Sequence, residues 1–160
     1  MLIISDTSPI IGLAICKKLN LLQTLFDTVY IPPAVYDELN VPGKPEFDRI
    51  SEWVKGRIVP AVNVPLINAL RLTLDPGESE AIALYWEKQA DYLLIDEKRG
   101  RAVARSGGVK IVGTAGILLL AKDRGLISGI KSSLDILIRN DFRISDLLYR
   151  QLLKKAGEDG

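Results

Sequence analysis

The sequence predicts an α/β fold with three layers, in which helices cover both faces of a short, mostly parallel central sheet. Short apolar segments, such as residues 2–5 and 92–95, alternate along the chain with helical patterns. These segments are apolar throughout, as expected for strands buried on both faces. With 160 residues, of which 48% are apolar and 26% charged, the chain fits one ordinary domain with a sizeable core. We expect a single domain over residues 1–156 and a C-terminal tail over residues 157–160.

The first half of the chain contains two clear strand patterns and several helical ones. Residues 2–5 and 28–31 are rich in β-branched and apolar side chains, which favours strands. Residues 57–62 predict a further short strand at a sheet edge, because Pro60 has no amide hydrogen to donate. Helices are expected over residues 9–19, with Thr7 or Ser8 as the cap, and over 20–26, 32–39 and 46–55.

The second half continues the alternation. Asp75-Pro76-Gly77 is a typical helix start, and acidic residues follow it in the first turn. Strands are expected at residues 92–95 and 109–113. Further helices are expected over residues 97–107, 114–125 with Thr114 as the cap, 129–139 and 144–156.

Acidic residues lie where a ligand site is expected in such a fold. Asp6 and Asp96 each follow a predicted strand directly. In open α/β sheets, ligands bind beyond the carboxyl ends of the strands, where the strand order reverses. If the two strands are neighbours, their backbones lie about 5 Å apart and both carboxylates can share one ion. Glu38 lies in the helix after the second strand, and Glu78, with Glu80 as an alternate, begins the helix before residues 92–95.

These acids predict a metal site because the chain contains no histidine. Clustered carboxylates suit a hard divalent cation such as Mg²⁺ or Mn²⁺. Without a cation, each close pair of carboxylates costs roughly 4 kcal/mol at 4 Å and an effective dielectric constant of about 20. The pattern therefore points to metal-assisted phosphodiester chemistry.

Each acid taken alone also has a structural interpretation. Asp6 and Asp96 are possible helix caps, and Glu38 is a possible plain surface residue. Glu78 and Glu80 sit where acids complement a helix dipole. The catalytic interpretation therefore depends on whether these side chains come together in space.

The chain resembles a PIN domain, and more narrowly the prokaryotic VapC toxin type. The resemblance rests on the order of DTSP, PAVYDEL, GESEAIAL, LLIDEKRGRAVA and GTAGILLLAK, and it runs from Leu2 to about Ala156. It implies a ribonuclease that uses Mg²⁺ or Mn²⁺ and a quartet of acids. The implied catalytic residues are Asp6, Glu38, Glu78 and Asp96, the metal ligands Asp6, Glu78 and Asp96 with Glu80 as alternate, and the supporting hydroxyl residues Ser8 and Thr114.

The resemblance also implies an RNA substrate, a homodimer and a small antitoxin partner. Arg99, Arg101 and Arg105 are candidates for binding flanking phosphates, although their spacing does not place all three on one helix face. Two features depart from the family pattern, namely Glu rather than Asp at the third acid and LIDEKR around the fourth.

Charge, cysteine content and hydropathy indicate the cellular setting, and two other functions are considered beside the nuclease. The net charge of +1 gives no global attraction to nucleic acid. The single cysteine fits a reducing cytoplasm, and no apolar run approaches the roughly 18 residues that span a bilayer. A non-catalytic PIN-like module that binds nucleic acid or protein is the main alternative. A phosphoacceptor receiver domain is disfavoured, because a lone Asp6 precedes Thr-Ser where that class places an acidic pair.

Overall fold

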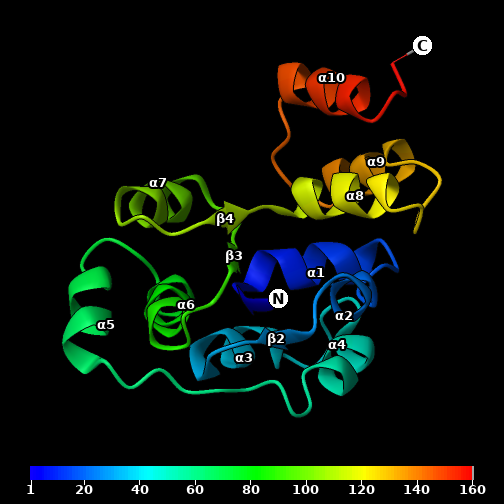
Figure 1. Cartoon of the computed structure of the whole chain (residues 1–160). Helices are drawn as coiled ribbons and strands as arrows, with labels where there is room; N and C mark the ends of the chain where they lie inside the picture. Colours follow the sequence, from blue (N-terminus) through cyan, green and yellow to red (C-terminus); the bar gives the residue numbers. More distant parts are fainter. Residues whose placement is uncertain (160) are drawn as a thin grey trace.

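The computed structural model describes residues 1–159 and contains one sheet of four parallel strands (Figure 1). The strands are β1 (Leu2–Ser5), β2 (Thr28–Tyr30), β3 (Tyr92–Leu94) and β4 (Ile111–Val112), in the order β2-β1-β3-β4. This arrangement confirms the predicted parallel sheet. Gly160, the last residue of the expected tail, lies outside the described residues.

Alternating side chains of the strands bury into two separate cores. Ile3 of β1 and Leu94 of β3 pack into the first core, whereas Ile4 and Leu93 pack into the second. Because successive side chains of a strand point to opposite faces, each core lies on one face of the sheet. Both faces are therefore covered, which confirms the three-layer prediction.

Helices from both ends of the chain build the first core. In Figure 1 most of these helices lie to the right of β3 and β4, and Ile10, Leu118 and Leu137 are fully or almost fully buried among them. The helices are α1 (Thr7–Ile15), α2 (Leu21–Leu25), α3 (Pro33–Leu39), α4 (Phe47–Trp53), α8 (Thr114–Asp123), α9 (Lys131–Arg139) and α10 (Asp146–Lys155).

Three helices cover the second face, to the left of the strands in Figure 1. They are α5 (Val64–Leu70), α6 (Pro76–Glu87) and α7 (Lys98–Ser106). Helix α6 buries the most residues in this core, including Ile82 and Leu84. Helix α5 buries none of its residues, so it contributes little to the core.

Several boundaries differ from the sequence prediction. Helix α1 begins at Thr7 rather than Pro9, and ends at Ile15, because Lys17 adopts a left-handed backbone conformation. The predicted strand over residues 57–62 is wrong. Only a single parallel bridge joins Ile58 to Ile31 beyond β2. Thr114 is the first residue of α8 and not its cap, which is Gly113.

The C-terminal segment packs back onto the domain. Helix α10 lies against α8 (Figure 1). After α10, the Glu158 carboxylate accepts hydrogen bonds from the Ile130 and Lys131 amides at the start of α9. Among residues 1–159, none of the helices combines the length and apolarity that a membrane crossing requires.

Candidate active site

The strand order reverses at β1, which has β2 on one side and β3 on the other. The Asp6 amide, directly after β1, donates a hydrogen bond to the Leu94 carbonyl at the end of β3, at 2.9 Å. Asp96 follows two residues later. The two acids therefore lie at the same edge of the sheet, on adjacent strands, where α/β folds bind their ligands.

Asp6 is the most deeply placed acid of this edge. Only 3% of the residue is exposed, and its carboxylate forms no capping hydrogen bond although Asp6 holds the cap position of α1. Burial raises the pKa of Asp6 well above its usual value, the carboxylates of Asp75, Glu78 and Glu38 raise it further, and the Thr7 amide offsets part of the increase. Three other acids are thus close enough to Asp6 to repel its charge.

Glu78 reaches the same place from the start of α6. It forms a reciprocal capping box with Asp75, because the Glu78 amide donates to Asp75 Oδ1 at 2.8 Å and the Asp75 amide donates to Glu78 Oε1 at 3.2 Å. Burial is the main cause that raises the pKa of Glu78 to about 7, and the charge on Asp75 adds to it. The second oxygen of Glu78 approaches Gly100 of α7, where a side chain would collide with it.

Glu38 extends from α3 toward the same group. Its carboxylate accepts a hydrogen bond from the Thr7 hydroxyl and lies against Gly77, whose missing side chain makes room for it. Partial burial of the carboxyl raises the pKa of Glu38, the Thr7 hydroxyl lowers it, and the charges on Asp75 and Glu80 raise it. Glu38 is an exposed residue, but its carboxylate contacts Thr7 and Gly77 at this edge.

Glu80 has a different task from Glu78. Its Oε1 accepts a hydrogen bond from the Ala34 amide, at 3.1 Å, in the first turn of α3. Glu80 therefore ties α6 to the start of α3, whereas Glu78 faces Asp6. This difference favours Glu78 as the third acid of the site.

Asp96 is held by Thr114 at the start of α8. Its Oδ1 accepts from the Thr114 amide at 2.8 Å, and its Oδ2 accepts from the Thr114 hydroxyl at 2.6 Å. The cap of α7 is Glu97, so the interpretation of Asp96 as the cap of that helix is wrong. Burial raises the pKa of Asp96, while Thr114 and the charge on Arg101 lower it.

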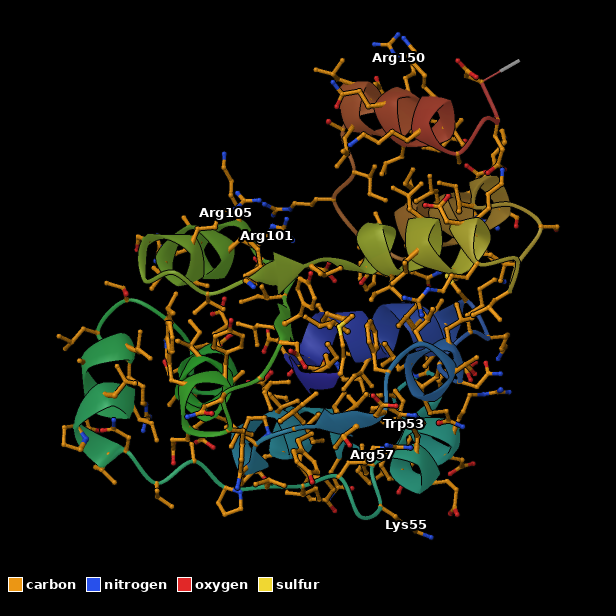
Figure 2. All side chains as sticks on the ribbon, viewed as in Figure 1. Trp53, Lys55, Arg57, Arg101, Arg105 and Arg150 are labelled. Carbon is orange, nitrogen blue, oxygen red and sulfur yellow. The ribbon has the colours of Figure 1, made fainter. Side chains whose placement is uncertain are left out.

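The three candidate arginines of α7 occupy different environments. Arg101 is half-buried, and its Nη1 donates to the Ile95 carbonyl at 2.8 Å. Arg99 and Arg105 are exposed, and Arg99 makes one long contact, at 3.5 Å, to the Thr73 carbonyl. Figure 2 shows Arg101 and Arg105 projecting from α7, well away from Arg150 on α10. Ser8 lies half-buried in the first turn of α1.

Sequence reasoning missed two functional neighbours of the quartet. Asp75 was recognised only as part of a helix start, although the spacing from Asp75 to Glu78 is that of a capping box. Thr7, the partner of Glu38, gave no local signal, because the hydrogen bond joins residues 31 positions apart. Only the packing of α1 against α3 brings them together.

The donor chemistry fits a hard divalent cation. The carboxylates at this edge offer only oxygen atoms, and their raised pKa values show that a nearby positive charge would favour the ionised forms. Within residues 1–159, no three or more His, Cys, Asp or Glu side chains are already arranged as an ion site.

The fold is that of an α/β domain with acids gathered beyond the carboxyl ends of its strands. A profile described as PIN domain matches residues 2–158, nearly the whole chain. The chain belongs to the PIN domain family. No curated protein and no solved structure matches the chain significantly.

Proposed function

We propose that this protein is a metal-dependent endoribonuclease that hydrolyses RNA phosphodiester bonds at the edge defined by Asp6, Glu38, Glu78 and Asp96. The observation that carries the proposal is the convergence of acids around buried Asp6, whose pKa is raised by burial and by three neighbouring carboxylates. PIN domains are generally nucleases, which supports a hydrolytic role for such a cluster.

The residues have distinct tasks in this proposal. Asp6, Glu78 and Asp96 hold Mg²⁺ or Mn²⁺, and Glu38 orients the attacking water from α3. When bound, such an ion activates water and neutralises charge on the phosphate. Thr114 fixes the orientation of Asp96, and Thr7 fixes that of Glu38. Glu80, the alternate ligand, is less suited because it caps α3.

The alternative is a PIN-like module that binds nucleic acid or protein without cleaving it. One observation favours it, namely that both oxygens of Asp96 already accept hydrogen bonds from Thr114. A carboxylate oxygen has more than one lone pair, so these bonds leave Asp96 able to bind an ion.

The proposed setting is the cytoplasm, with a second protein chain as partner. Helices α9 and α10 bury Leu137 and Leu153 in the first core, but Leu147 and Leu148 of α10 are 61% and 41% exposed. We propose this part of α10 as the contact with a second copy of the chain or with a small antitoxin. A role as the toxin of a toxin–antitoxin pair would follow from the second case.

An RNA cleavage assay tests the proposal. Purified protein is incubated with a fluorogenic single-stranded RNA in Mn²⁺, in Mg²⁺ and in EDTA. We expect cleavage that needs the metal and falls by about 100-fold or more in Asp6→Asn, because even an indirect partner of a metal ligand costs 10- to 100-fold. Circular dichroism confirms that the variant is folded. Equal cleavage by Asp6→Asn and wild type would place the site elsewhere.

A further inference from the structure

Arg101 is a basic residue at the acidic edge, and the proposed reaction above assigns it no role. Among the basic residues of α7, Lys98, Arg99 and Arg105 are exposed, whereas Arg101 is half-buried. Burial lowers the pKa of Arg101, and the positive charge of Arg105 lowers it further. A guanidinium nevertheless stays protonated in proteins, so a fixed positive charge is kept here.

The position of the Arg101 guanidinium is set by the end of β3. Its Nη1 donates to the carbonyl of Ile95, the residue directly before Asp96, at 2.8 Å. A side chain added at Gly113 would meet both Arg101 Nη1 and Asp96 Oδ1, each at 2.9 Å. The two atoms are therefore less than about 6 Å apart, within the range over which opposite charges influence each other. The bare backbone of Gly113 leaves this space free.

Arg101 lies near Asp96 but forms no ion pair with it. In the described part of the chain, no ion pair of 4.0 Å or less involves Arg101. A guanidinium has five N–H donors in a planar fork, and the Ile95 carbonyl accepts a hydrogen bond only from Nη1. The remaining donors are free to bind an anion at the carboxyl edge, and forked donors match phosphate oxygens in pairs.

We propose that Arg101 is the phosphate-positioning residue of this site, with its guanidinium held by the Ile95 carbonyl and its free donors bound to a non-bridging oxygen of the RNA phosphodiester beside Asp96. The proposal rests on the nuclease function above, and it separates Arg101 from Arg99 and Arg105, which bind flanking phosphates at most. The simpler alternative is that Arg101 only ties α7 to β3.

Three variants separate these roles. Arg101→Ala removes the guanidinium, Arg101→Lys keeps the charge but replaces the planar fork with three donors on one nitrogen, and Arg124→Ala is the matched control. Arg124→Ala removes the same charge at an exposed position, at the end of α8 opposite Thr114. We expect Arg101→Ala and Arg101→Lys each to lose roughly 100-fold in kcat/KM, the cost of removing one preorganised donor. Arg124→Ala should change kcat/KM by less than about threefold, as surface substitutions do.

A second readout does not need cleavage. The affinity for a short RNA is measured in EDTA by fluorescence anisotropy, and the thermal midpoint is recorded for each variant. We expect Arg101→Ala and Arg101→Lys to weaken RNA binding by about tenfold while Arg124→Ala binds like wild type. If wild type binds RNA but never cleaves it, the nuclease proposal fails and this binding pattern still decides the role of Arg101. Full activity and binding in Arg101→Lys, with a loss in Arg101→Ala that follows its thermal midpoint, would show a structural tie only and overturn the proposal.

Discussion

Both carboxylate oxygens of Asp96 accept hydrogen bonds from the single residue Thr114, from its hydroxyl at 2.6 Å and from its amide at 2.8 Å. Gly113 holds the cap position of α8 but has no side chain to accept a hydrogen bond from the first turn. The Asp96 carboxylate accepts one there instead. The bond also fixes the orientation of one proposed metal ligand. A structural role and a proposed catalytic role therefore meet in the same carboxylate.

Replacing Thr114 with valine should destabilise the protein by about 1–2 kcal/mol, because a hydrogen bond from a buried hydroxyl to a charged oxygen is lost while the amide bond remains. Thr114→Ser keeps the hydroxyl and serves as the control. Urea unfolding at pH 7 measures both. Equal stability of the two variants would mean that the hydroxyl bond contributes nothing.

Glu78 should make the metal-free protein less stable as pH rises. Its pKa is raised to about 7 in the folded state by burial, against 4.5 as the usual value, so the folded state holds a proton that the unfolded state has already released. The free energy of unfolding therefore falls between about pH 4.5 and pH 7. Glu78→Gln removes this titration and keeps an oxygen that can accept from the Asp75 amide.

We expect the stability of Glu78→Gln relative to wild type to increase by about 2–3 kcal/mol from pH 4.5 to pH 8 in EDTA, at about 1.4 kcal/mol per pKa unit. Denaturant titrations of both proteins at a series of pH values measure the difference. Apart from the charge that Glu78 adds near Asp6, the other carboxyl groups with raised pKa values are present in both proteins, so their contributions to the difference in stability largely cancel. A difference that does not change with pH would show that Glu78 titrates normally.

Gly100→Ala should affect activity more than stability. The added methyl would collide with Glu78 Oε2 and lie 2.6 Å from Ile95 Cδ1, so the flexible Glu78 carboxylate has to move. A displacement near 1 Å can cost about 100-fold in rate. The stability cost should stay near 1 kcal/mol, as for mild overpacking.

Gly107→Ala, at the end of the same helix, is the control for Gly100→Ala. Its nearest neighbour would be 3.5 Å away, an ordinary contact, and its backbone suits any residue. RNA cleavage rates and thermal midpoints of both variants test the prediction. Equal activity in the two variants would argue that the Glu78 carboxylate has no fixed position in catalysis.

Local sequence signals were sufficient to predict where Asp6 and Asp96 lie and where α6 begins. Asp6 and Asp96 each follow a short apolar strand, and the parallel order of strands then brings them to one edge. The Asp75-Pro76-Gly77-Glu78 string predicted the start of α6, which the structure confirms with Pro76 as its first residue. Such features depend on neighbours in the sequence, so they are visible without the structure.

Features that depend on long-range packing were not predictable in the same way. Glu78 and Glu80 are two residues apart, yet only the packing of α6 against α3 directs Glu80 to the Ala34 amide. Helix α5 was missed because it has only seven residues and none is fully buried, so half-buried Leu66, Ile67 and Leu70 form too short a pattern. Residues 57–62 have the composition of a strand, but Pro60 and the lack of a further partner limit them to one bridge at Ile58.

Calorimetric titration of the metal-free protein with Mn²⁺ tests most directly whether these acids form an ion site. Wild type, Asp6→Asn and Asp48→Asn are compared, the last being an exposed acid in the first turn of α4. We predict saturable binding by wild type and Asp48→Asn, and binding at least about tenfold weaker in Asp6→Asn. Absence of saturable binding in wild type, or equal binding by Asp6→Asn, would contradict the account.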